Sequence, residues 1–189
     1  MRIKLILIGL FLVVAIPVYP QAKPAAIGSR SQFAIGAGFS DYASDWSGRY
    51  DGGALWADWN PGRGPSFLHG LGLEIEARDL SIDENSLSSK LQLDTIGGGP
   101  IYTIRRFRNI HPYAKFLISY ASFDFPGYKQ KWHYSHDTRT EYTPGFGAEY
   151  RIGHNVWVRG DYEYQFFVNF FNHHAMNPNG FTVGASYEF

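Results

Sequence analysis

Apolar and polar residues alternate with a period of two along several segments of this chain. The clearest segment spans residues 181–189, where Phe, Val, Ala, Tyr and Phe fill every second position and small or polar residues stand between them. Residues 142–152 and 156–166 alternate in the same way, and their polar positions include full charges. Because successive side chains of a strand point to opposite faces, this period predicts half-apolar β-strands.

About eight such segments recur at intervals of roughly twenty residues, which is the spacing of a strand plus its connection. The chain therefore predicts one all-β domain over residues 33–189, an antiparallel, up-and-down sheet. Gly97, Gly98, Gly99 and Pro100 indicate a bulge or sharp bend, and Pro144 is expected near a strand end or a bulge. The predicted strands cover residues 33–40, 53–59, 69–78, 91–104, 112–123, 142–152, 156–166 and 181–189.

The distribution of charge favours a transmembrane β-barrel over a soluble sheet. One face of the best strands carries Tyr, Phe, Val and Leu with almost no charge, as a lipid-facing surface requires. The other face combines charges with glycines, which suits the lumen of a small closed barrel. A soluble sandwich or lipocalin-like barrel is the alternative, but a soluble barrel would need an apolar lumen. The predicted interior charge network consists of Glu74, Glu76, Arg78, Glu149, Arg151, Arg159, Asp161, Glu163 and Glu188.

The connections between the predicted strands alternate in length. Short ones are expected near residues 60–66, 105–109 and 153–155. Longer polar ones are expected near residues 44–49, 81–90, 124–139 and 169–178. This rhythm is typical of outer-membrane barrels, which have short periplasmic turns and longer extracellular loops.

The N-terminal segment has the three parts of a secretory signal peptide. Arg2 and Lys4 precede an apolar run from Leu5 to Val18, and Ala22 follows it. The run is shorter than the roughly 20 residues that a spanning helix needs, so we predict a cleaved signal over residues 1–22 rather than an anchor. Cleavage after Ala26 is the alternative, and residues 23–32 form a short leader.

Composition agrees with a membrane barrel and excludes several other classes of protein. Of 189 residues, 44% are hydrophobic and 17% aromatic, with 21 glycines, which favours strands and interfacial aromatic girdles. Lys+Arg and Asp+Glu are both 17, so losing Arg2 and Lys4 leaves 15 against 17 and a formal charge of −2. Nothing indicates a nucleic-acid partner. The absence of cysteine excludes disulfides and a lipoprotein anchor.

The chain resembles the small bacterial outer-membrane β-barrel superfamily, the group of the OmpA transmembrane domain and of OmpX and Ail. The resemblance rests on FAIGAGFSDY at residues 33–42, VRGDYEYQF at 158–166 and NGFTVGASYEF at 179–189. It implies export to the outer membrane and contact with its lipid and lipopolysaccharide. It also implies that Tyr187 and Phe189 serve as the signal read by the barrel-assembly machinery. It implies no cofactor and no particular activity.

A histidine pair is the most unusual local feature. His173 and His174 stand in the last long connection, in a stretch that loosely resembles the His-containing motif of PagL-type lipid A deacylases. No serine lies within the stretch, and without a nucleophile a general-base histidine has nothing to activate. His133 and His136 lie near Asp137, but a metal site needs three or four converging ligands, so we predict none.

These observations lead to a non-catalytic function. We expect a structural or surface-interaction role in the outer membrane, with the extracellular loops contacting a possible extracellular ligand and no cofactor. A lipid A-modifying enzyme and a small porin-like pore remain as alternatives. The pore is the less expected because the lumen of about eight strands is just filled by side chains.

Overall fold

All nine elements in the part of the chain that the computed structural model describes are strands. That part comprises residues 32–43, 48–62, 68–82, 91–124, 136–167 and 177–189. No helix in it is long and apolar enough to span a membrane. The strands are β1 (Gln32–Ala43), β2 (Arg49–Asn60), β3 (Leu71–Ile82), β4 (Leu91–Thr103), β5 (Ile110–Asp124), β6 (His136–Arg151), β7 (Val156–Tyr164), β8 (Phe166–Phe167) and β9 (Asn179–Glu188).

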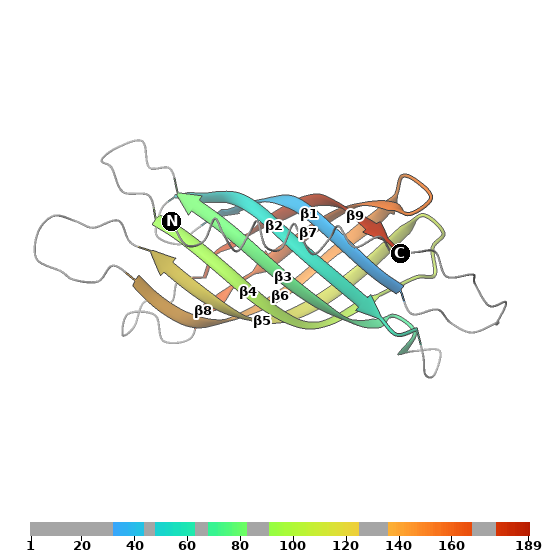
Figure 1. Cartoon of the computed structure of the whole chain (residues 1–189), viewed down its shortest axis with the longest axis horizontal. Helices are drawn as coiled ribbons and strands as arrows, with labels where there is room; N and C mark the ends of the chain where they lie inside the picture. Colours follow the sequence, from blue (N-terminus) through green and yellow to red (C-terminus); the bar gives the residue numbers. More distant parts are fainter. Residues whose placement is uncertain (1–31, 44–47, 63–67, 83–90, 125–135, 168–176) are drawn as a thin grey trace, which may run out of the picture.

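The strands close on themselves into an antiparallel barrel (Figure 1). They follow the order β5-β4-β3-β2-β1-β9-β7-β6-β8, and the pairing of β5 with β6 completes the ring. β1 and β9 form the seam between the two ends of the chain, with Ala34 opposite Glu188 and Ala43 opposite Asn179. The predicted fold class, a single up-and-down barrel, is confirmed.

β7 and β8 are two parts of one strand, so the barrel wall has the predicted eight strands. β8 continues the register in which β7 pairs with β6, from Gly145 opposite Glu163 to Tyr142 opposite Phe166. The break falls beside Pro144, which lacks an N–H for the ladder. The expectation that Pro144 lies at a strand end or bulge is wrong, because it lies inside β6 opposite Phe116 in a continuous register.

The predicted bulge at the glycine triplet is also wrong. β4 pairs with β3 without a break, from Glu76 opposite Gly97 to Leu73 opposite Pro100. The glycines serve close packing instead, since a Cβ at Gly99 would lie 2.0 Å from the Phe116 carbonyl oxygen. A side chain there would force the neighbouring strand away.

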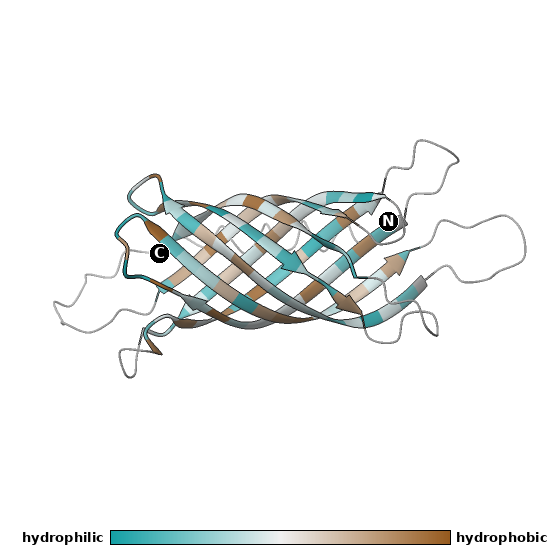
Figure 2. Cartoon of the chain, turned by 180° about the vertical axis from the view of Figure 1, so that it is seen from behind, coloured by the Kyte–Doolittle hydropathy of each residue, from teal (hydrophilic) through white to brown (hydrophobic). Residues whose placement is uncertain are grey.

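The outer surface of the barrel is a belt of exposed apolar side chains. Hydrophobic and hydrophilic residues alternate along the strands (Figure 2). Ile75 is 61% exposed, Val183 59% and Phe146 64%, although all three lie within strands. A soluble monomer rarely exposes so large a contiguous apolar surface, whereas lipid requires one.

The two ends of the barrel differ in their connections. The long-loop end carries the connections 44–48, 83–90, 125–135 and 168–178, and the short-turn end carries 61–70, 104–109 and 152–155. The predicted alternation of length fails for the first pair, because 44–48 is shorter than 61–70. It holds for the rest. The predicted signal peptide and almost all of the leader lie outside the described residues.

The lumen is filled by two layers of different chemistry. Near the long-loop end, apolar side chains form the apolar plug: Tyr42, Tyr50, Leu80, Leu93, Ala121, Phe123 and Phe167. These residues are at most 4% exposed, and Phe123 meets Phe167 edge to face at 5.2 Å. Below the plug, toward the short-turn end, the lumen is filled by buried charges.

Candidate functional site

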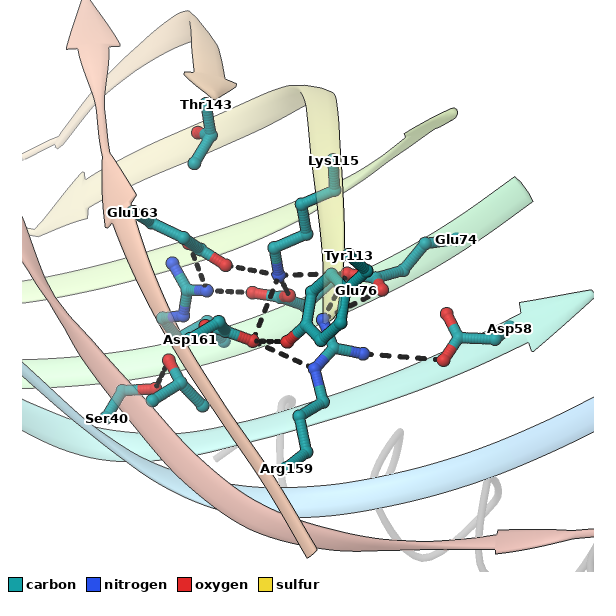
Figure 3. Close-up of polar contacts among 12 residues, drawn as sticks. Ser40, Asp58, Glu74, Glu76, Tyr113, Lys115, Thr143, Arg159, Asp161 and Glu163 are labelled. Carbon is teal, nitrogen blue, oxygen red and sulfur yellow. Dashed lines mark hydrogen bonds and ion pairs between the residues drawn. The ribbon is translucent and has the colours of Figure 1, made fainter. Parts of the chain in front are cut away.

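A network of buried ion pairs occupies the middle of the lumen. Its side chains come from different walls of the barrel and point toward one another (Figure 3). Three cations, Arg78, Lys115 and Arg159, are linked to five carboxylates: Asp58, Glu74, Glu76, Asp161 and Glu163. We call these eight residues the ion-pair network.

Lys115 is at the centre of the network. It extends inward from β5, and its side chain is fully buried. Its Nζ lies 2.9 Å from Glu74 Oε1 and 2.7 Å from Glu76 Oε2, both on β3. It also contacts Glu163 on β7 and lies 3.6 Å from Asp161 Oδ2. One ammonium group therefore joins strands on opposite sides of the lumen.

Arg159 makes a second set of bridges. Its Nε donates to Asp161 Oδ2 at 2.8 Å, and its Nη2 lies 2.8 Å from Glu74 Oε2. Nη1 reaches Asp58 Oδ2 on β2 at 3.4 Å. The guanidinium lies between two aromatic rings, 4.7 Å from the centroids of both Trp56 and Tyr113. Arginine suits this position because its planar fork pairs with carboxylates while its faces stack on aromatic rings.

Arg78 and two tyrosines complete the hydrogen bonding of the carboxylates. Arg78 Nη2 lies 2.6 Å from Glu163 Oε2 and also contacts Glu76. The Tyr42 hydroxyl donates to Glu163 Oε2 at 2.6 Å, and the Tyr113 hydroxyl donates to Asp161 Oδ2 at 2.6 Å. Five carboxylates face only three cations here, so neutral donors help to satisfy the surplus of acceptors.

Burial makes these contacts energetically important. Glu74 and Glu163 are 0% exposed and Arg159 is 1% exposed. Removing a charge from water costs several kcal/mol, and only close opposite charges with further hydrogen bonds offset that cost. Leaving one partner alone would therefore cost more than the pair itself contributes. The network ties β2, β3, β5 and β7 together and blocks the lumen.

Six of the nine predicted interior residues belong to the ion-pair network, and three do not. The six are Glu74, Glu76, Arg78, Arg159, Asp161 and Glu163. Glu149 and Glu188 line cavities at the short-turn mouth instead. Arg151 lies there too, exposed, and donates to the carbonyls of Gly153 at 3.0 Å and His154 at 2.6 Å.

Sequence reasoning missed the lysine at the centre of the network. Lys115 lies in a segment whose faces were not assigned, as does Asp58, and Tyr42 and Tyr113 were not considered. The sequence did contain a signal. Lys115 lies on the same face of its strand as Tyr113 and Leu117, whereas Phe116 and Ile118 lie on the opposite face. Glu141 was also missed. It is 1% exposed, between the network and the plug, and accepts a hydrogen bond from Thr143.

The other predicted site residues have different placements. Tyr187 and Phe189 contact each other with ring centroids 5.0 Å apart, and Phe189 N donates to Phe33 O at 2.9 Å across the β1–β9 seam. His173 and His174 lie outside the described residues, as does His133. Within the described ranges, no group of three or more His, Asp or Glu side chains is arranged to hold a metal ion.

A closed antiparallel barrel with an apolar outer belt and a charged, filled lumen is the architecture of a small transmembrane β-barrel. The family model described as "Outer membrane protein beta-barrel domain" matches residues 8–189. The chain belongs to this family, and the protein is located in the bacterial outer membrane. No curated protein matches the chain.

Solved structures of small outer-membrane barrels share the fold. Ail, the attachment invasion locus protein of Yersinia pestis, is 15% identical at a TM-score of 0.60, covering 85% of this chain and 99% of that one. Neisserial surface protein A is 17% identical at a TM-score of 0.61, and the match covers 84% of this chain and 97% of that one. OprG from Pseudomonas aeruginosa is 10% identical at a TM-score of 0.54, and the match covers 86% of this chain and 97% of that one. At these identities the likeness shows the fold alone.

Proposed function

We propose that this protein is a non-conducting, non-catalytic barrel whose long loops contact partners outside the cell. The observation that carries the proposal is the filled lumen. The ion-pair network crosses the middle of the barrel, and the apolar plug closes it toward the long-loop end. A barrel sealed by two consecutive layers is a rigid support for loops rather than a path for solutes.

The orientation follows from the connections. Outer-membrane barrels place short turns in the periplasm and longer loops outside. By that rule the short-turn end, with connections 104–109 and 152–155, faces the periplasm. The long-loop end then faces the medium, next to lipopolysaccharide. The assembly-signal role of Tyr187 and Phe189 belongs to the same proposal.

The rim of the long-loop end is acidic, which limits the class of extracellular ligand. Asp41, Asp51, Asp79, Asp94 and Asp124 lie near the ends of five consecutive strands, β1 to β5. Asp41 pairs with Arg49, and Asp79 and Asp94 accept hydrogen bonds from Gln92. A structure of Ail holds the heparin analogue sucrose octasulfate. The acidic rim of the present barrel would repel such a polyanion, so we expect a neutral or cationic ligand.

Single-channel recording tests the closed lumen. Purified protein reconstituted into planar bilayers is expected to give no stable current steps. The double variant Leu80→Ala plus Phe123→Ala opens the plug but leaves the ion-pair network, and it is also expected to stay silent. Stable currents from the wild-type protein would replace this proposal by a pore.

Two further measurements address the loops and the enzymatic alternative. Cells expressing the protein are expected to retain no more labelled heparin than cells without it, and clear retention would contradict the argument from the acidic rim.

The lipid A mass spectrum is expected to be the same with the wild type and with His173→Ala plus His174→Ala. Loss of an acyl chain that depends on the two histidines would make the protein an enzyme.

A further inference from the structure

The described part of the barrel has a hollow at its short-turn mouth. A cavity of about 500 Å³ opens there, and a smaller one of about 50 Å³ adjoins it on the side of the lumen. They share the lining residues Gln32, Arg105, His111, Trp157 and Glu188. We call the two together the vestibule.

Cations dominate the lining of the larger cavity, whereas three carboxylates, Asp58, Glu149 and Glu188, line the smaller one. Arg105, Arg108 and Arg151 line the larger cavity, and Glu188 is the one acidic side chain among its lining residues. Arg105 and Arg108 come from the turn between β4 and β5, while Arg151 comes from the end of β6. Three arginines, two from one turn and one from the end of a neighbouring strand, therefore line one open space.

Arg105 is an exposed side chain that makes no hydrogen bond or ion pair among the described residues. Desolvation by the surrounding residues lowers the pKa of its guanidinium, and the carboxylates of Glu188, Glu149 and Asp58 act in the opposite direction. An arginine keeps its charge at neutral pH even so. A guanidinium whose N–H groups make no hydrogen bond within the protein can pair with an anion in the larger cavity.

Arg151 is held in position. Its Nε and Nη2 donate to the carbonyls of Gly153 and His154, and its guanidinium lies 5.7 Å from the centroid of the Trp157 ring. Trp157 in turn stacks on His111 at 4.4 Å between ring centroids. This fixed aromatic wall reduces the entropy lost when the arginine binds a ligand.

The ion-pair network forms the floor of the vestibule. Asp58 lines the smaller cavity and lies 3.4 Å from Arg159 Nη1, so a ligand cannot pass further into the lumen. Access is from the aqueous side of the short-turn end. The ligand must therefore be an anion present in that compartment or at the adjacent membrane surface.

We propose that the vestibule binds a phosphate group through Arg105, Arg108 and Arg151. Guanidinium forks pair with phosphate oxygens in bidentate geometry, and a phosphate offers three oxygens to groups that approach from different sides. The phosphate comes either from a free phosphate compound or from the headgroup of a phospholipid in the facing leaflet. This site is independent of the proposed loop function, because it lies at the opposite end of the barrel.

NMR titration of the isotope-labelled protein in a maltoside detergent, which carries no phosphate, tests the site. Inorganic pyrophosphate is added at constant ionic strength, with acetate as the control anion. We expect saturable shifts confined to residues 104–111, 151–157 and 186–189, and much weaker shifts with acetate. A second titration in nanodiscs compares anionic phosphatidylglycerol with phosphatidylcholine, whose phosphate is neutralised by the choline of the same headgroup. Shifts that require phosphatidylglycerol would identify the headgroup as the source.

Matched variants assign the effect to the vestibule. Arg105→Gln and Arg151→Gln are each expected to weaken binding about tenfold or more, the usual effect of losing a charge-assisted contact. Arg49→Gln is the control: it removes the same charge from the long-loop end and is expected to leave the affinity unchanged. The proposal is overturned if neither phosphate source gives saturable shifts, if acetate matches pyrophosphate, or if Arg49→Gln weakens binding as much as Arg105→Gln.

Discussion

Lys115 on β5 and Glu74 on β3 meet across the lumen, with Nζ 2.9 Å from Oε1 and neither side chain exposed. β4 lies between their strands in the wall, so the contact spans the interior rather than a strand ladder. The same ammonium group also contacts Glu76 and Glu163. The stability of the barrel should therefore depend strongly on this one lysine.

Lys115→Met is expected to lower the free energy of unfolding by about 3–5 kcal/mol, because it leaves buried carboxylates without their cation. Urea unfolding in lipid vesicles measures the change. Arg49→Met is the control, since it breaks an ion pair with Asp41 in which the arginine side chain is 68% exposed. Such exposed pairs contribute about 0–1 kcal/mol. Equal losses in the two variants would show that burial of the network adds nothing.

Gly36→Ala is expected to disturb the wall of the ion-pair network. A Cβ at Gly36 would lie 2.2 Å from Trp56 Cε2, so the indole that stacks on Arg159 must shift. Overpacking of this kind costs about 1–3 kcal/mol. Tryptophan fluorescence and urea unfolding report the change. At Gly53 no atom lies within 4 Å of an added Cβ, so Gly53→Ala should be neutral or slightly stabilising. A silent Gly36→Ala would mean that Trp56 is loosely packed.

Ile75→Arg is expected to destabilise the barrel through contact with lipid. Ile75 is 61% exposed on the outer face of β3, between the buried Glu74 and Glu76. An arginine near the middle of the bilayer costs about 2–4 kcal/mol, falling to about 0–1 kcal/mol near the interface. Ile104→Arg, in the turn after β4, is therefore the control. Refolding into vesicles measures the loss of stability in both variants. Equal losses would contradict the placement of Ile75 deeper in the membrane than Ile104.

Phe189→Ala is expected to reduce assembly of the barrel several-fold in outer-membrane fractions. Phe189 packs against Phe33 at 5.9 Å and Tyr187 at 5.0 Å, so its ring lies at the closing seam. The heat-modifiable fraction on SDS gels measures assembly. Phe181→Ala removes a similarly exposed ring from β9, the strand that precedes Phe189, and leaves the terminal position unchanged. If both variants assemble equally well, Phe189 is not an assembly signal.

Much of the fold was predictable from the alternation of residues. A period of two follows from the geometry of a single strand, so Phe181, Val183 and Tyr187 could be assigned to the lipid face without knowing any neighbour. The number of strands and the burial of Arg159, Asp161 and Glu163 followed from the same argument. Around Lys115 the sequence predicted the strand but not which of its residues face the lumen, so the central cation of the network was missed.

Local signals were misleading where the neighbouring strand decides the outcome. Pro144 and the triplet from Gly97 to Gly99 are turn or bulge residues by preference, yet both lie within continuous registers. The missing N–H of Pro144 is accommodated by the break between β7 and β8, and the glycines allow close approach of β5. Such compensation depends on the residues of the neighbouring strand, which a local sequence pattern does not reveal.

The sequence by itself determined the class of the protein through a strand period of two, with one charged face and one apolar face. Only the tertiary structure decided which charges meet. Closure of the ring brings Lys115 to Glu74 and Glu163, and it sends Glu149, Arg151 and Glu188 to the vestibule instead. The physical reason is that pairing across a lumen depends on register, strand tilt and depth together, and these quantities exist only when all strands are in place.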